Sequence, residues 1–329
     1  MVDQRYVPEL SVVIPAYNEQ HQLERTLEAV GFHAGRASSR YEIIVVDDGS
    51  SDSTWDVLQQ CAMRMRGVRG IRLSRNFGKE TALCAGLEEA RGAAVIVMDA
   101  DLQHPPELIA MMVHLWRTDA KADIVEGIKR VRGTEPLTKR LGAKAFYGAL
   151  TRLTGHRFEG ASDYKLLDRK VVDAWKRLPE RTTFFRGMIV WLGFRTVQVE
   201  FDVPPRSGGK TRWSFLSLAK LALNAIIAYS AVPLRLIGVV GLLFLLGAFA
   251  LGAQTLFRKW TGDAVTGFTT VILLLLVIGS AVMISLSTIG EYVAAIYNEV
   301  KGRPRYLIRE RVERETEGNE LALSGSRHA

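Results

Sequence analysis

Hydrophobic residues in the first hundred positions form short continuous runs that alternate with longer amphipathic stretches. Short apolar runs of this kind are typical of strands that are buried on both faces of a sheet. We expect strands at residues 11–14, 42–46, 71–73 and 93–98. Apolar residues between them recur at helical spacing, which predicts helices at residues 20–30, 53–65 and 79–90. The alternation predicts an α/β fold with a mostly parallel sheet that is covered on both faces.

Two much longer apolar runs follow in the second half of the chain. Residues 236–257 form a run of 22 residues without a charge, and residues 264–290 form another of 27. A helix of the first length spans about 33 Å, which is roughly one hydrocarbon core. A buried core helix is the alternative, but two such runs in tandem, with charges only at their ends, favour a two-helix transmembrane hairpin.

The formal net charge of +8 is concentrated beside these runs. Residues 203–235 contain five basic residues and no acid, and residues 301–312 contain five basic residues and one acid. The connector, residues 258–263, carries only +1. The positive-inside rule therefore predicts a plasma (inner) membrane protein whose N-terminal domain and both termini are cytoplasmic. No apolar stretch begins the chain, so we expect no signal peptide.

The remaining composition excludes several classes of protein. A hydrophobic fraction of 48% and a charged fraction of 24% exclude a wholly disordered chain and one that is mostly membrane. The two cysteines, Cys61 and Cys84, have no metal-ligand spacing and cannot staple a chain of 329 residues, which favours a reduced cytosolic environment. Because the basic residues flank apolar runs instead of covering a recognition face, we expect no nucleic-acid partner.

The segment before the first apolar run has the composition of a helix at a membrane interface. It reads WSFLSLAKLALNAIIAY, with one charge in the middle and aromatic residues at both ends. Pro233 then predicts a bend. We divide the chain into an α/β domain at residues 1–212, an interfacial amphipathic helix at 213–233, two transmembrane helices at 234–293, and a cytosolic basic tail at 294–329 whose end we expect to be disordered.

Polar residues and a proline stand where the predicted strands end. In open α/β sheets, ligands bind at the carboxyl ends of the strands. The candidate site residues at these ends are Pro15, Tyr17, Glu19, Asp47, Asp48, Asp99 and Asp101. The sequence from Asp47 to Ser50 is also ordinary turn chemistry, and this alternative stays open. Neither a GxGxxG element after the first strand nor a GxxxxGK[ST] element is present, so the usual dinucleotide and P-loop fingerprints do not apply.

The pair Asp99 and Asp101 gives the clearest chemical signal. Residues i and i+2 of an extended segment point the same way, so their carboxylates repel each other unless a cation joins them. Carboxylate oxygens favour Mg²⁺ or Mn²⁺, and Gln103 could add a neutral oxygen. A solvated acidic turn is the alternative. His104, which precedes two prolines, is better interpreted as a loop residue than as a metal ligand.

Several motifs together carry a resemblance to a known family. SVVIPAYNE at 11–19, EIIVVDDGSSD at 42–52, LSRNFGKETAL at 73–83 and VMDADLQHPPELI at 97–109 resemble family 2 glycosyltransferases with the GT-A fold. RSGGKTRW at 206–213 and GEYVAAIYNEVKGRPRYLI at 290–308 are similar to segments of its polyprenyl-phosphate glycosyltransferase group, which includes dolichol-phosphate mannose synthases and bacterial GtrB-type enzymes. The resemblance covers about residues 10–310.

The resemblance implies roles for individual residues. Pro15, Tyr17, Glu19, Asp47, Asp48 and Lys79 match the nucleotide side, while Asp99, Asp101 and Gln103 match the metal and diphosphate positions. Asp163 matches an aspartate near the acceptor that has been proposed as a base, so we count it with Asp101 among the catalytic candidates. Arg206 and Arg212, which we also count as catalytic candidates, match basic residues around the phosphates, as do Lys129 and Lys139. Arg212 stands where the family often has Lys, and Ser162 to Lys165 depart from the usual Gly-Asp-Phe-Arg.

The implied reaction is inverting transfer of a hexose from a nucleotide sugar to the phosphate of a membrane polyprenyl phosphate, with undecaprenyl phosphate and a UDP-hexose such as UDP-glucose favoured. A phosphate monoester has a second pKa of about 6, so the acceptor is already mostly ionised at neutral pH. No strong general base is therefore required, and Asp163 is free to act by positioning. The product would serve cell-envelope glycan modification.

Other functions stay open. A polyprenyl-phosphate mannose synthase that uses GDP-mannose has the same motifs. A membrane scaffold that binds nucleotide sugar without turnover is a different class, which the intact DADLQ sequence disfavours. A processive polysaccharide synthase would need a QxxRW element, but Gly209 stands where its Gln belongs. A homo-oligomer, a flippase and a downstream glycosyltransferase remain open as partners.

Overall fold

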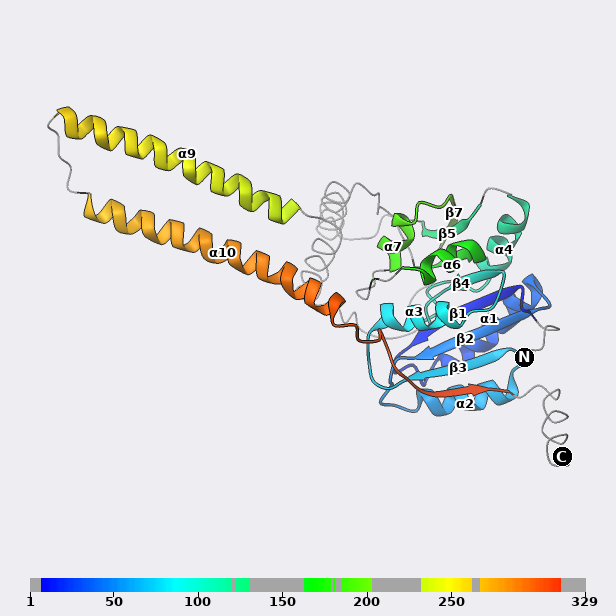
Figure 1. The fold of residues 1–329 in the computed structure, drawn as a ribbon. Coiled ribbons are helices and arrows are strands. Elements are labelled where there is room, and N and C mark those ends of the chain that lie inside the picture. The colour runs from blue at the N-terminus through cyan, green and yellow to red at the C-terminus, as the bar shows by residue number, and fades with distance from the viewer. Residues whose placement is uncertain are drawn as a thin grey trace, which may run out of the picture. The chain divides into compact units, whose positions relative to one another are not determined.

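The computed structural model describes residues 7–119, 122–130, 163–178, 180, 185–202, 232–261 and 267–314 (Figure 1). The chain divides into two compact units. The first comprises Met1–Lys144, His156–Arg212 and Arg303–Ala329, and the second comprises Ala145–Gly155 and Trp213–Gly302. Most of the interfacial helix expected at 213–233 and the end of the tail lie outside the described residues, so both stay predictions.

The first unit contains an eight-stranded sheet with the order β7-β5-β6-β4-β1-β2-β3-β8. The strands are β1 (Leu10–Ala16), β2 (Tyr41–Asp47), β3 (Val68–Leu73), β4 (Ala94–Val97), β5 (Ile124–Lys129), β6 (Lys165–Asp168), β7 (Thr196–Phe201) and β8 (Ile308–Glu313). The central strands β4, β1, β2 and β3 are parallel. Strand β6 is antiparallel to both β4 and β5, β7 is parallel to β5, and β8 is antiparallel to β3. The expected α/β class with a mostly parallel sheet is confirmed.

Helices cover both faces of this sheet. They are α1 (Leu23–Ala37), α2 (Thr54–Arg64), α3 (Lys79–Glu89), α4 (Leu108–Thr118), α6 (Arg169–Lys176) and α7 (Phe185–Trp191). Alternate residues of a strand face opposite sides, so Leu10, Val12 and Ile14 join one core with residues of α1, α2 and α4. Val13 faces the other side, where a Cβ added to Gly86 of α3 would lie 2.2 Å from its Cγ1 atom. Helix α3 therefore packs very closely on the sheet.

The last strand comes from the C-terminal part of the chain. Strand β8 pairs with β3, and Figure 1 shows it at the edge of the sheet. Gly70 of β3 lies opposite Val312, and a Cβ at residue 70 would lie 2.6 Å from the Val312 Cγ1 atom. The glycine therefore makes room for the one β8 side chain that is buried. Sequence analysis assigned this segment to a basic tail and did not predict the strand.

The second unit contains two long helices, α9 (Val232–Thr261) and α10 (Phe268–Val300). Within them, Leu236–Thr255 has a mean hydropathy of 2.5 and Leu274–Val300 has one of 1.9. Neither stretch is buried inside the protein, and both are long and apolar enough to cross a membrane. They are the candidate spans that the two uncharged runs predicted.

Candidate active site

A cleft opens where strands β1, β2 and β4 end, on the edge of the sheet that sequence analysis predicted. Its volume is about 280 Å³. It is lined by Pro15, Ala16, Tyr17, Glu19, Asp48, Asn76, Gly78, Lys79, Asp99, Ala100 and Asp101. Every predicted strand-end residue except Asp47 therefore lines one cavity, together with Lys79. The cleft belongs wholly to the first unit.

One wall of the cleft is built by two loops that are joined through Asp48. The carboxylate of Asp48 accepts hydrogen bonds from the backbone N–H of Phe77 at 2.7 Å and of Gly78 at 2.8 Å. Gly49 follows with φ of +66°, and a Cβ there would lie 2.4 Å from the backbone carbon of Arg75. Only glycine fits this close approach. Burial raises the pKa of Asp48, while the two amides oppose the shift.

Asp47 points away from the cleft. One carboxylate oxygen accepts from the backbone N–H of Ser50 at 3.0 Å, and the other lies 3.4 Å from Arg72 Nε. Its side chain is fully buried, and burial raises its pKa. In this structure Asp47 holds the turn after β2, which is the alternative that sequence analysis left open, and its proposed contact with the nucleotide stays a prediction.

The loop that carries Asp99 and Asp101 is fixed by neighbours on both sides. Thr26 of α1 donates its hydroxyl to the carbonyl of Ala100 at 2.8 Å. The backbone N–H of Asp99 donates to Nδ1 of His104 at 3.0 Å, so this buried ring supports the loop, as expected of a loop residue. Leu102 has φ of +57°, and this left-handed turn lets the N–H of Gln103 donate to Asp101 Oδ1 at 3.0 Å.

The chemistry of these groups fits a divalent cation. Asp99 and Asp101 both line the cleft, Asp99 with its Oδ1 atom paired to Lys79, and carboxylates are hard ligands that suit Mg²⁺ or Mn²⁺. Gln103 supports Asp101 through its backbone and does not line the cleft. Within the described ranges, no group of three His, Cys, Asp or Glu side chains could hold a metal. The pair is therefore an open site that would need ligands from substrate or water.

Behind the cleft, charged groups form a chain that begins at Asp99. Lys79 Nζ lies 2.6 Å from Asp99 Oδ1 and 2.8 Å from Asp163 Oδ2. Arg186 of α7 binds Asp163 with both arms of a fork, Nε to Oδ1 at 2.6 Å and Nη2 to Oδ2 at 2.9 Å. Asp163 is buried and does not line the cleft itself. Lys79 is thus the link between the carboxylate pair and Asp163.

These contacts fix the charge of Asp163. Burial alone would raise its pKa, but hydrogen bonds and charge from Arg186 and Lys79 hold the pKa well below the usual range. Burial alone would lower the pKa of Lys79, but the charges of Asp99 and Asp163 raise it above its usual value. Asp163 is therefore an ionised carboxylate at neutral pH whose oxygens are both engaged, which makes it a weak proton acceptor.

Other predicted residues lie elsewhere. Lys165 forms a buried ion pair with Glu126 between β6 and β5, so it is a structural residue of the sheet. Lys129 is the last residue of strand β5, and the role of its side chain stays a prediction. Lys139, Arg206 and Arg212 also lie outside the described residues, and their roles stay predictions.

Sequence analysis missed Asn76 and Gly78 in the lining, and Arg186 and Glu80 behind it. Arg186 is the single charge in the stretch TTFFRGMIVWL, residues 182–192. A lone charge among apolar residues needs a buried partner, and that signal was available. Glu80 accepts a hydrogen bond from the backbone N–H of Phe185 at 2.6 Å, a contact between segments distant in sequence that no local pattern reveals.

Comparison with known proteins gives relatives over almost the whole chain. The model of glycosyl transferase family 2 matches residues 11–175. An uncharacterized glycosyltransferase of Synechocystis is 41% identical over 302 residues, which cover 91% of this chain and 94% of that protein. The prophage bactoprenol glucosyl transferase homolog of Escherichia coli is 34% identical, with 91% of this chain and 98% of the relative covered. The bactoprenol glucosyl transferase of Shigella phage SfX is also 34% identical, with 92% and 99% covered.

Among solved structures, the glucosyl-3-phosphoglycerate synthase of Mycobacterium tuberculosis in complex with Mn²⁺, UDP and phosphoglyceric acid matches with a TM-score of 0.48 and 20% identity. The match covers 67% of this chain and 76% of that one. This is a comparison of shape, and it assigns no ligand to the cleft described above.

Proposed function

The chain belongs to glycosyltransferase family 2, with a GT-A-like α/β domain, and we propose that it transfers a hexose to the phosphate of a membrane polyprenyl phosphate. The donor in this proposal is UDP-glucose or a related UDP-hexose, the acceptor is undecaprenyl phosphate, and the anomeric configuration inverts. The observation that carries the proposal is the strand-end cleft with its carboxylate pair, in a chain that aligns over nearly its full length with bactoprenol glucosyl transferases.

The donor side of the proposal rests on Asp99 and Asp101. A divalent cation bound there would supply Lewis-acid stabilisation of the leaving nucleoside diphosphate. The two residues hold oxygens ready on a loop that Thr26 and His104 fix in place, so little reorganisation is needed on binding. Asp48 and Tyr17 line the same cleft, where we propose that they contact the nucleotide.

The acceptor side needs a nucleophile and not a base. The phosphate of a polyprenyl phosphate loses its second proton at about pH 6 and attacks as a dianion. Asp163 is already ionised and tied to Arg186 and Lys79, so we propose that it positions these cations. In the same proposal, Arg206 and Arg212 bind the lipid phosphate, because cationic donors near the membrane suit a phosphate that arrives from the bilayer.

The proposed location is the plasma membrane, with α9 and α10 as its two crossings. The basic flanks at 203–235 and 301–312 favour a cytoplasmic position for the cleft and for both termini. Lipid-linked sugar made on this side would serve envelope glycan modification, through a flippase and a second glycosyltransferase. Access of an impermeant cysteine label to residue 314, from the outer face only, would contradict this topology.

A transfer assay tests the proposal. The purified full chain in detergent would be incubated with radiolabelled UDP-glucose, undecaprenyl phosphate and Mg²⁺ or Mn²⁺, and the label in the organic phase counted. We expect label in lipid that depends on the acceptor and disappears with EDTA. A parallel assay with radiolabelled GDP-mannose distinguishes the glucosyltransferase from the mannose synthase, since only the latter would transfer mannose to the lipid. Binding of nucleotide sugar without any lipid product would favour the scaffold.

A further inference from the structure

The two ends of helix α3 face different surroundings. Its first residues reach the active site, where Lys79 pairs with Asp99 and Asp163 and Glu80 accepts from Phe185 N–H. Its last turn lies in a second cluster of charged residues, which includes Arg69 near the start of β3. Eleven residues, or about 16 Å of helix, separate the two ends.

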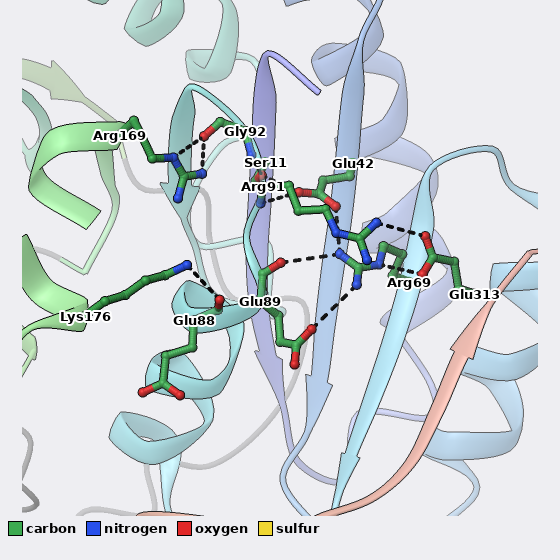
Figure 2. Close-up of polar contacts among 10 residues, drawn as sticks. All are labelled: Ser11, Glu42, Arg69, Glu88, Glu89, Arg91, Gly92, Arg169, Lys176 and Glu313. Atoms are coloured by element: carbon green, nitrogen blue, oxygen red, sulfur yellow. Dashed lines mark hydrogen bonds and ion pairs between the residues drawn. The ribbon is translucent and has the colours of Figure 1, made fainter. Parts of the chain in front are cut away.

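The last turn of α3 needs cations from elsewhere. It contains Glu88 and Glu89 and no basic residue, although the C-terminal end of a helix favours positive charge. Figure 2 shows how other elements supply it. Lys176 of α6 donates to the carbonyl of Glu88 at 2.7 Å, and Arg69 of β3 lies 3.7 Å from the Glu89 carboxylate.

The segment after the second candidate span supplies the remaining partners of Glu88 and Glu89. We call residues 305–313 the C-terminal strap. Arg305 Nη1 donates to Glu88 Oε1 at 3.3 Å and its Nη2 to the carbonyl of Leu178, while the Tyr306 hydroxyl donates to Glu88 Oε2 at 2.5 Å. Arg311 donates to Glu89 Oε1 at 2.8 Å. Three strap side chains therefore bind the same helical turn.

The strap is itself held firmly by the sheet. Strand β8 pairs with β3, and the backbone N–H of Ser74 donates to the carbonyl of Leu307 at 2.8 Å. Trp55 of α2 donates its indole N–H to Glu310 at 3.0 Å. In Figure 2, Glu313 binds both Arg69, at 3.1 Å, and Arg91, at 3.5 Å. The strap is thus a fixed point against which α3 is held.

Packing on the sheet and charged contacts at its two ends together fix the position of α3. Gly86 lets the helix approach Val13 and Val46 closely, which fixes the distance between helix and sheet. Other residues of α3 are fully buried and also resist sliding of the helix, among them Leu83, Cys84 and Leu87. Besides this packing, movement along the axis has to break the ion pairs of Lys79 at one end and of Glu88 and Glu89 at the other.

We propose that the C-terminal strap positions the active-site end of α3, so that Arg305 and Tyr306 are positioning residues for Lys79. They touch neither the cleft nor Asp163, and they act through the helix. This inference rests on the proposed function of the cleft, because it names residues that set the geometry of the same site. A shift of α3 along its axis moves Lys79 relative to both Asp99 and Asp163.

Kinetics of the full chain in detergent give the first test. The double variant Arg305→Ala with Tyr306→Phe should lower kcat by about tenfold and leave KM for the nucleotide sugar within about twofold, as expected for lost orientation. Arg305→Lys keeps the charge and should recover most of kcat. The matched control is Arg309→Ala on the same strap, since Arg309 is exposed and pairs with its neighbour Glu310. The control should match the parent protein.

Hydrogen exchange without substrate gives the second test, and it does not depend on the reaction. In the double variant, amides of residues 79–83 should exchange about tenfold faster, while those of β1 and β2 stay unchanged, because the opening is local. Faster exchange confined to residues 86–90, with unchanged kcat, would overturn the proposal. Faster exchange in β1 and β2 would also overturn it, since the strap would then be a general stabiliser. If the parent protein transfers no hexose, the proposed function fails, and the exchange result alone decides this inference.

Discussion

Two ionic clusters lie at the two ends of helix α3, and they differ in how they meet water. In the cleft cluster, the side chains of Lys79 and Asp99 are 42% and 28% exposed. In the cluster of Figure 2, those of Arg69 and Glu42 are 9% and 5% exposed. Both clusters share cations among several carboxylates. The comparison teaches that the open cluster keeps groups within reach of a ligand, whereas the closed one is satisfied by the protein alone.

The closed cluster shows how a buried charge is tolerated. Arg69 Nη1 donates to Glu42 Oε2 at 2.8 Å, and Glu42 Oε1 accepts from the Ser11 hydroxyl at 2.6 Å and from the Arg91 backbone N–H at 2.8 Å. Each carboxylate oxygen of Glu42 has a partner, as buried ions require. Such a cluster connects β1, β2 and β3 and contributes directly to the fold.

The largest effect should follow from breaking the open cluster. Asp101→Asn removes one charge of the carboxylate pair, and we expect transfer to fall by about 1000-fold, or about 4 kcal/mol in the barrier. The melting temperature should be unchanged, because among the residues that the structure describes Asp101 accepts a single loop hydrogen bond, from Gln103. Asp56→Asn, on the exposed side of α2, is the control. Near-normal transfer at saturating Mg²⁺ or Mn²⁺ would remove the metal from the proposal.

Breaking the closed cluster should affect stability instead. Arg69→Ala leaves Glu42 buried without its cation, which should lower the free energy of unfolding by about 3 kcal/mol. Chemical unfolding in detergent, followed by tryptophan fluorescence, measures this loss. Transfer per folded molecule in the cold should fall by no more than the roughly tenfold expected when the strap is loosened, since Arg69 reaches the cleft only through α3 and the strap. If Arg69→Ala is as stable as the parent protein, the closed cluster does not stabilise the fold, and the contrast with the open cluster fails.

A smaller effect separates positioning from base catalysis in the open cluster. Asp163→Asn keeps the shape and removes the charge, and we expect kcat to fall by about tenfold. The carboxylate has a folded pKa below its unfolded value, so its stabilising contribution is present above the unfolded pKa and is lost only as the pH falls through the folded one. Between pH 5 and 9 it stays ionised. The pH profiles of both proteins should therefore follow the acceptor phosphate, with a limb near about pH 6.

The contrary outcome for Asp163 is equally specific. Loss of several orders of magnitude in the Asn variant, together with a carboxylate limb that is present only in the parent profile, would make Asp163 a true base.

The smallest effect concerns the exposed rim of the closed cluster. Arg91 and Glu313 form an ion pair at 3.5 Å, and both side chains are about half exposed. Solvent screens such a pair, so Arg91→Ala should change the free energy of unfolding by less than about 1 kcal/mol. The same unfolding assay measures this change. A loss as large as that of Arg69→Ala would mean that the strength of these ion pairs does not depend on how exposed they are.

Local patterns predicted the centre of the sheet and most of the cleft, because a parallel strand buried on both faces is apolar throughout and its end is marked by polar residues. Asp48, Asp99 and Asp101 were found in this way. The strand β8 was not, since it reads Ile-Arg-Glu-Arg-Val-Glu and buries one side chain. Its pairing depends on Gly70, about 240 positions earlier in the chain, and no periodicity within the segment records that partner.

The partner of Asp163 was missed for a related reason. Sequence analysis counted Asp163 as a catalytic candidate from the family resemblance and left open whether it acts as a base or by positioning. Arg186 and Lys79 change its chemistry completely, and both come from other elements, α7 and α3. A residue type indicates which reactions are available to it, but the neighbours decide its charge, and neighbours are set by tertiary structure.

The place of β8 in the chain has a consequence for biosynthesis. Because this edge strand follows both candidate spans, the ribosome finishes the two spans before it makes the strand that covers β3. Until then the edge of β3 has unpaired backbone groups, which are a template for association with other chains. Completion of the sheet therefore waits until both candidate spans have been synthesised. A chain cut short before residue 308 would keep this edge of β3 open.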